Sequence, residues 1–186
     1  MLRNLFVFML FLTTTIAGEY VIDDTHSRVG FSIRHMMISN VNGEFKKYDA
    51  DIEINEKTGT FLVLDAEIET KFIDTGIQKR DNHLKSPDFF DAKQYPLISF
   101  KMKEHIGDLI KGDLTIHGVT KAIALKVEIA GFVKDPWGNK RTGFSLHGKI
   151  NRSDFGLTWN KMLETGGLVV GDEVKLQIDV EAISLD

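Results

Sequence analysis

The amino-acid sequence predicts an all-β protein whose strands close into an eight-stranded antiparallel barrel. Apolar side chains alternate with polar ones over most of the chain, which is typical of strands with one buried face. Short turn sequences such as Asn42-Gly43, Gly107-Asp108 and His117-Gly118 separate these stretches, and short links favour antiparallel neighbours. Closing the sheet removes exposed edges. A two-sheet sandwich would carry much the same alternation, so the pattern leaves that architecture open.

The first eighteen residues, 1–18, are expected to be a secretory signal peptide. Arg3 precedes an apolar run over residues 5–12, and small residues lead to Ala17, as in a leader with its cleavage site. A spanning helix needs about 20 apolar residues, more than this run offers. We expect cleavage before Gly18, a periplasmic or secreted location, no transmembrane segment in the mature chain, and one domain over residues 19–186. An uncleaved N-terminal anchor is the alternative.

The remaining chain contains eight alternating stretches. In the third, Leu62, Leu64 and Ile68 are expected to share the inner face; in the last, the clearest, the apolar side runs from Val174 to Val180. The expected strands lie within Val29–Ile33, Val41–Ile54, Leu62–Ile68, Ile98–Met102, Leu114–Ile116, Ile123–Ile129, Phe144–Ile150 and Val174–Val180.

One segment, residues 74–85, breaks the alternation and has helical spacing instead. Its apolar residues Ile77 and Leu84 fall on one face of a helix. Asp74 or Thr75 is expected to be the N-cap, because a short polar side chain can accept a hydrogen bond from a free backbone N–H. We place this short helical insert between the third and fourth strands, close to one mouth of the barrel.

The expected interior is almost wholly apolar, but several inward positions carry little bulk. Small residues among large ones would leave an apolar channel for a ligand, whereas glycines also mark the bends that close a barrel. An eight-stranded barrel is either filled by side chains or holds one small ligand. The spacing leaves both outcomes open. The small positions are Gly43, Ala66, Gly112, Ala122 and Gly148.

Composition excludes several classes of function. The chain has no cysteine, which rules out disulfides, thiol catalysis and zinc–thiolate sites. It has 23 Lys and Arg against 27 Asp and Glu, a formal net charge of −4, so no nucleic-acid partner is expected. The six histidines are scattered singly, and neither a metal site nor a cofactor is expected. No serine-hydrolase elbow, phosphate-binding loop or zinc-protease helix is present.

The strongest polar cluster is Arg80, Asp81 and His83 on the insert. A catalytic interpretation makes His83 a general base oriented by Asp81. Residues two apart on a helix point to different sides, so these two are poorly placed to pair. The alternative is structural: Arg80 and Asp81 tie the insert to the barrel rim through ion pairs and hydrogen bonds. A third role is that Arg80 or His83 contacts the polar head of a ligand.

Several segments in order resemble the YceI-like family. The likeness runs from about Glu19 to the C-terminus, and the joint order and spacing of its motifs are specific. The segments are Asp23–Ser27, Phe31–His35, Val41–Phe45, Asp74–Gly76, Arg80–Leu84, Asp88–Asp91, Tyr95–Pro96, Gly112–Thr120, Asp135–Gly138, Arg152–Gly156 and Gly171–Val174.

The resemblance implies a lipocalin-like antiparallel barrel of bacterial export compartments that binds a polyisoprenoid or another long amphiphilic lipid, without established enzyme activity. It favours the cavity over the packed core. The only bound group expected is then a lipid or isoprenoid ligand, held by residues of the strands and the insert. The expected ligand-binding residues are Phe31, Ile33, His35, Phe45, Leu64, Ile68, Arg80, His83, Leu84, Phe90, Phe100, Leu114, Phe144 and Trp159.

Two rival functions remain. One is an enzyme acting on a lipid-like exported substrate, with a polar site at the barrel mouth around Arg80, Asp81 and His83. The other is a protein with a packed core, an adhesin or stress protein, that acts through its surface and holds no ligand. Symmetric dimers are the commonest oligomers, so a homodimer through exposed strand faces or the insert also stays open.

Overall fold

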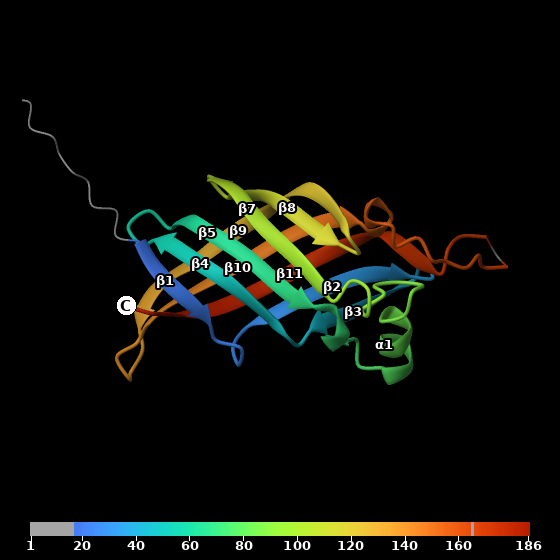
Figure 1. Ribbon diagram of the computed structural model, residues 1–186, viewed down its shortest axis with the longest axis horizontal. Coiled ribbons are helices and arrows are strands. Elements are labelled where there is room, and N and C mark those ends of the chain that lie inside the picture. Colours follow the sequence, from blue (N-terminus) through green and yellow to red (C-terminus); the bar gives the residue numbers. More distant parts are fainter. Residues whose placement is uncertain (1–16, 165) are drawn as a thin grey trace, which may run out of the picture.

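The fold is described by a computed structural model that covers residues 17–164 and 166–186 (Figure 1). Ala17 and Gly18 begin the first strand, and the rest of the predicted leader lies outside the described residues. The elements are β1 (Ala17–Ile22), β2 (Arg28–His35), β3 (Ser39–Phe45), β4 (Tyr48–Asn55), β5 (Thr60–Glu69), η1 (Thr70–Phe72), β6 (Ile73–Asp74), α1 (Gln78–Leu84), β7 (Leu97–Ile106), β8 (Leu109–Ile116), β9 (Val119–Lys134), β10 (Lys140–Asn151), η2 (Arg152–Phe155) and β11 (Val170–Ser184).

The strands form a closed antiparallel barrel, which confirms the predicted fold class and excludes the sandwich. Around the ring the order is β1-β4-β5-β7-β8-β9-β10-β11, and β11 pairs with β1 to close it. These are eight strands. Four of the eight neighbouring pairs, β4–β5, β7–β8, β8–β9 and β9–β10, are joined by short turns, as is common for antiparallel strands. The closed sheet gives one continuous inner face for the apolar side chains.

Two positions of the barrel are each occupied by a broken strand. β11 pairs with two strands. The first part of β11 pairs with β2, and the C-terminal end of β11 pairs with β1. β4 pairs with β1, and β3 pairs with β2. The expected strand Val41–Ile54 is therefore β3 and β4, interrupted at Lys46-Lys47. The first strand expected from the alternation corresponds to β2 alone. The alternation did not indicate β1.

The inner face of β5 differs from the prediction at its start. Phe61 is 2% exposed, whereas Leu62, which was expected inside, is 42% exposed. The register of β4 and β5 shifts between Glu53 and Ile54, and a bulge of this kind turns preceding side chains to the opposite face. From Leu64 onward the expected alternation holds, with Leu64 buried and Ile68 half-buried.

The helical insert lies between β6 and β7, as expected, but α1 is shorter than the predicted segment. The N-cap is Ile77, and no side chain caps the helix. The expected caps, Asp74 and Thr75, are engaged elsewhere: Asp74 accepts a hydrogen bond from Gly76 N–H, and Thr75 is bonded to α1 from the side. Among the described residues, no helix has the length and hydrophobicity required to cross a membrane.

One end of the barrel is packed solid by its own side chains. Tyr20, Ile54, Phe61 and Ile110 are all buried there, and the Phe61 ring packs edge-on against Phe144 at 4.9 Å between centroids. This end contains the β9–β10 turn and the C-terminal end of β11. α1 lies at the other end, beside β2 and β3 (Figure 1). The packed end of the barrel is therefore opposite the end that carries α1.

Candidate functional site

The half of the barrel nearest α1 encloses an apolar cavity of about 600 Å³. This volume lies within the range of roughly 300–1,000 Å³ that is typical of small-molecule sites. All fourteen residues predicted to bind a ligand lie on its wall: Phe31, Ile33, His35, Phe45, Leu64, Ile68, Arg80, His83, Leu84, Phe90, Phe100, Leu114, Phe144 and Trp159. Their binding role stays a prediction, while their convergence on one cavity is a structural fact.

Inward-facing aliphatic side chains of β2 and β11 face the cavity instead of a packed neighbour. Ile33, Val174, Leu176 and Ile178 line the cavity and are only half-buried. In a filled barrel, side chains on the inner face would be covered by others, as Ile54 and Ile110 are at the packed end. The barrel is thus both a packed core at one end and a cavity at the other.

Most of the small positions are covered by neighbouring side chains, whereas Ala66 lines the cavity. A Cβ atom on Gly43 would lie 2.4 Å from Phe31 Cζ, and one on Gly112 would lie 2.5 Å from Phe100 Cζ. Both glycines are therefore already covered by aromatic rings. Gly148 is covered in the same way by Leu125, and Ala122 is exposed on the outer face. The spacing left a ligand channel and close packing both open, and the structure shows each: Ala66 lines the cavity, whereas neighbouring side chains occupy the space beside Gly43, Gly112 and Gly148.

The polar residues of α1 bond to Thr75, on the segment that precedes the helix. The buried carboxylate of Asp81 accepts hydrogen bonds from the Thr75 N–H, at 3.0 Å, and from its hydroxyl. Arg80 donates from Nε to Thr75 Oγ1 and from Nη2 to Thr75 O, both at 2.7 Å. These bonds fix the helix to the chain that enters it. No ion pair is formed by either residue within the described chain, so that part of the structural interpretation was wrong.

His83 is paired with Asp88, not with Asp81. Its Nε2 lies 2.8 Å from Asp88 Oδ2, and its ring packs edge-on against Trp159 and Phe89 at 4.8 and 5.0 Å between centroids. The catalytic arrangement with Asp81 is therefore excluded in this structure. Asp81 points toward Thr75 while His83 points toward Trp159, as residues two apart on a helix must.

Cationic side chains outnumber carboxylates on the wall of the cavity. Arg34 and Lys79 are exposed and Arg80 and His83 are half-buried, whereas Asp49 is the carboxylate among the lining residues. With Ile77 and Trp159, these cationic and aromatic residues surround the end nearest α1, which we call the mouth. An apolar interior with polar groups at one end suits a ligand with a long apolar tail and a polar head.

Arg152 is a further residue of the cavity wall, and no sequence pattern predicted it. Its side chain lines the cavity although it is 6% exposed. It donates from Nε to Gly171 O at 2.8 Å and from Nη1 to Leu157 O. Burial lowers its pKa from the ordinary value. The Arg152–Gly156 motif was quoted only as a family likeness, and nothing in its local pattern indicated that the guanidinium turns inward.

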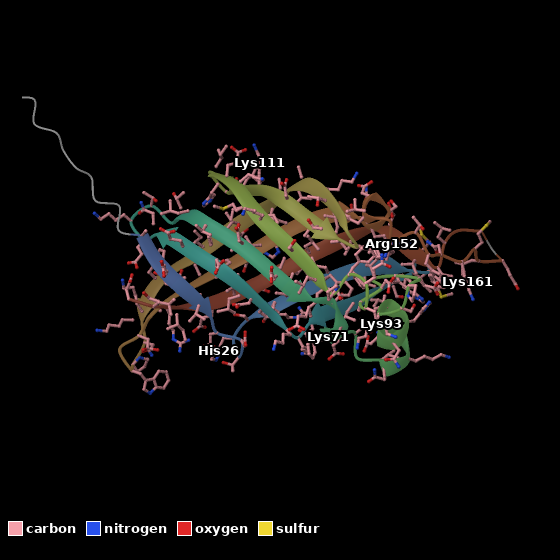
Figure 2. All side chains as sticks on the ribbon, viewed as in Figure 1. His26, Lys71, Lys93, Lys111, Arg152 and Lys161 are labelled. Carbon is pink, nitrogen blue, oxygen red and sulfur yellow. The ribbon has the colours of Figure 1, made fainter. Side chains whose placement is uncertain are left out.

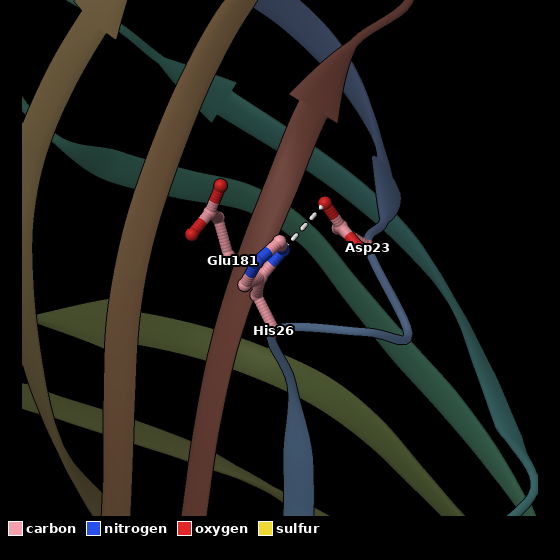
Figure 3. A group of neighbouring side chains, drawn as sticks. All are labelled: Asp23, His26 and Glu181. Carbon is pink, nitrogen blue, oxygen red and sulfur yellow. Dashed lines mark hydrogen bonds and ion pairs between the residues drawn. The ribbon is translucent and has the colours of Figure 1, made fainter. Parts of the chain in front are cut away.

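Outside the cavity, one cluster has the composition of a metal site, but a guanidinium occupies it. Asp23, His26 and Glu181 lie within reach of one another (Figure 3). Arg141 Nη1 donates to Asp23 Oδ2 at 2.7 Å and to Glu181 Oε1 at 2.6 Å. It also donates from Nε to Asp135. The carboxylates thus already hold a cation, and the cluster ties together the packed end of the barrel.

A comparison with known proteins gives a match over most of the chain. The family model for the YceI-like domain matches residues 20–182. The chain belongs to the YceI-like family. The resemblance proposed from the sequence motifs is confirmed.

Individual YceI-like relatives agree with this assignment. A UPF0312 protein of Staphylococcus aureus is 37% identical over 164 residues, which is 88% of this chain and 96% of that protein. The crystal structure of the Campylobacter jejuni YCEI protein has a TM-score of 0.72 and 41% identity, and the match covers 90% of this chain and 99% of that one. Burkholderia cenocepacia BcnA, at 23% identity and a TM-score of 0.73 over 86% and 98%, shares the fold.

Proposed function

We propose that the protein is an exported carrier or binding protein for a long-chain amphiphilic lipid, such as a polyisoprenoid, an isoprenoid quinone or a fatty-acid derivative. The observation that carries the proposal is the apolar cavity of about 600 Å³, whose polar residues gather at one end. One protein of the same fold, from Saccharophagus degradans, is described as a polyisoprenoid binding domain, at a TM-score of 0.68 and 15% identity over 90% and 99% of the two chains. The signal-peptide pattern of residues 1–18 supports export.

Burial of the tail would supply the affinity. Each methylene removed from water contributes about 0.8 kcal/mol, and association itself costs on the order of 4 kcal/mol or more. Roughly five methylenes only offset that cost, so long tails bind and short ones do not. The polar head would remain near Arg80 and His83, which sit at the mouth and keep it close to water.

The first test is mass spectrometry of the protein purified from the exported fraction, under native conditions and again after solvent extraction. A stoichiometric lipid that is released only on unfolding would establish the carrier and identify the ligand class. A protein that is empty and takes up neither isoprenoid nor fatty-acid derivatives would contradict the proposal.

A second test varies chain length in a homologous series of fatty acids. The dissociation constant is expected to fall about fourfold for each added methylene, until the tail fills the cavity and the gain stops. The plateau measures the usable length of the cavity. Affinity that is independent of chain length would show that the tail is not bound inside.

The rival enzyme has one observation in its favour, the pairing of His83 with Asp88 beside Trp159 at the mouth. A carboxylate-oriented histidine is a common general base. His83→Ala would then abolish turnover of a lipid ester while lipid occupancy stays the same. The carrier proposal expects no turnover in either protein and an altered affinity for the head group alone.

A further inference from the structure

Exposed apolar side chains gather around the mouth of the cavity. Of the fifteen large hydrophobic residues that are exposed in the described chain, six lie on three segments at this end. Ile38 is 80% exposed, Met162 82% and Met37 63%. We call the six the mouth face: Met36, Met37, Ile38, Ile77, Met162 and Leu168.

Two of the three segments of the mouth face, the β2–β3 turn and the loop before β11, are held against one another. The β2–β3 turn, residues 36–38, lies beside the loop that leads into β11, because Met36 N–H donates to Val169 O at 2.8 Å. Within that loop Met162 and Leu168 form an isolated β-bridge. The loop before β11 protrudes beyond the barrel at the end that carries α1 (Figure 1), and Lys161 lies on this loop (Figure 2). The apolar side chains of these two segments therefore lie side by side, and Ile77 is at the same end of the barrel on the segment that enters α1.

The backbone of the β2–β3 turn is strained to present these methionines. Met36 and Met37 have φ values of 49° and 65°, in the left-handed region that favours Gly, Asn and Asp. A non-glycine side chain in this region crowds the following carbonyl oxygen, so each of the two residues is destabilising in this conformation. A turn selected for stability alone would use Asn-Gly or Gly-Gly here. The methionines suit a role that needs adaptable apolar side chains.

Basic residues accompany this apolar surface. Arg34, Lys79 and Lys161 are exposed at the same end, and among the described residues none of the three takes part in an ion pair. The acidic groups on or next to these segments are Glu164, on the loop of Lys161, and three that are already bonded: Asp74 to Gly76 N–H, Asp88 to His83 and Asp172 to Ser153. Exposed apolar side chains flanked by free cations are typical of surfaces that bind anionic bilayers.

We propose that the mouth face docks on the surface of a lipid bilayer that contains anionic head groups. Its methionines and isoleucines insert among the acyl chains, while Arg34, Lys79 and Lys161 contact the head groups. A lipid can then pass between the bilayer and the cavity without crossing bulk water. The transfer role rests on the proposed function, but the docking surface stands on its own observations.

The opposite end of the molecule offers a matched control. Trp137, at the tip of the β9–β10 turn, is 81% exposed, and tryptophan is a strong interfacial anchor. It lies at the packed end, far from the mouth, next to the Arg141 cluster. If an exposed apolar side chain were sufficient for docking, Trp137 would bind the bilayer at least as well as the mouth face.

The experiment is flotation of the purified full chain with vesicles of phosphatidylethanolamine and phosphatidylglycerol, compared with phosphatidylcholine vesicles. Met37→Asn combined with Met162→Ser is expected to weaken binding to the anionic vesicles by roughly tenfold or more. Trp137→Ser is expected to bind as the unchanged protein does. Because Asn tolerates the left-handed region, Met37→Asn alone should raise the melting temperature while it weakens binding, so loss of binding is not loss of folding.

Several results would overturn the proposal. They are equal flotation of the double variant and the unchanged protein, loss of flotation in Trp137→Ser, or a mouth face that mediates self-association instead, seen as a dimer that the double variant abolishes. The two proposals fail separately. A protein that takes up a fatty acid from solution but never floats refutes docking alone, and one that floats but takes up no lipid refutes the carrier alone.

Discussion

Neighbouring residues on β11 meet two different environments, although the chain places them only one position apart. Leu176 lines the cavity, whereas Gln177 is exposed on the outer face. The pleat of the strand produces this difference, since successive side chains point to opposite faces. The same alternation places Phe31 and Ile33 inside. At this scale, binding depends on which side of the sheet a side chain occupies.

Leu176→Trp is expected to fill part of the cavity and weaken binding of a long-chain fatty acid by roughly tenfold, because the indole takes the space of about two methylenes of tail. The matched variant Gln177→Trp adds the same side chain outside and should bind as the unchanged protein does. Titration with a fluorescent fatty acid measures both. Equal affinities for the two variants would contradict the assignment of the inner face.

At the scale of elements, α1 forms one wall of the mouth and is too short to be stable by itself. It has seven residues and no side-chain cap, and isolated helices of this length do not persist in water. Its stability comes from the bonds of Asp81 and Arg80 to Thr75 and from the rings of Phe89 and Trp159. The mouth is therefore shaped by side chains that anchor the helix.

Thr75→Val keeps the shape of the side chain but removes the hydroxyl that bonds Asp81 and Arg80. The buried carboxylate of Asp81 then keeps only the bond from the backbone N–H of residue 75, and we expect the free energy of unfolding to fall by about 2 kcal/mol because the hydroxyl bond to a charged group is lost. Hydrogen exchange should rise over residues 75–90. Thr120→Val, whose hydroxyl is exposed and bonds only Thr115, is the control, with a change within about 0.5 kcal/mol.

At the scale of the whole molecule, the two ends of the barrel have different tasks. The packed end is held by apolar residues and by Arg141, which joins the turn after β1, the β9–β10 turn and β11 through Asp23, Asp135 and Glu181. The mouth end lacks such a cluster within the described chain, where Arg34, Lys79 and Lys161 form no ion pair. A rigid end and an open end suit a protein that exchanges a ligand through one mouth.

Acid is expected to destabilise the packed end through this cluster. Thr25 and Arg141 hold the pKa of Asp23 well below its usual range, and Arg141 does the same for Asp135. A carboxyl group whose pKa is lower in the folded state contributes stability above its unfolded pKa of about 3.9 and loses it as the pH falls toward the folded value. The melting temperature should therefore fall steeply below about pH 4.

Arg141→Met tests the origin of that loss. The variant should melt lower at pH 7, because three carboxylates lose their shared cation, and its melting temperature should change less between pH 7 and pH 3. Thermal unfolding at a series of pH values measures both effects. Parallel pH profiles for the two proteins would show that the acid sensitivity arises elsewhere.

Local pattern was sufficient to predict most of the fold. Alternation along β7, β8, β10 and β11 indicated the strands and their buried faces, and the helical spacing of residues 74–85 located α1. Deviations arose where pairing with a neighbour overrides the local signal. The bulge in β5 places Phe61 inside. The breaks between β1 and β2 and between β3 and β4 depend on the length of β11, which pairs with both β1 and β2.

The sequence by itself determined the class of the fold and the apolar residues of the cavity wall, because a two-residue period fixes which side of a strand each side chain occupies. Only the tertiary structure decided which part of the interior is empty, since Gly43 and Gly112 are covered by rings from other strands. It also decided that His83 pairs with Asp88 and that Arg152 turns inward. Those contacts depend on distances between segments remote in the chain, and no local pattern encodes such distances.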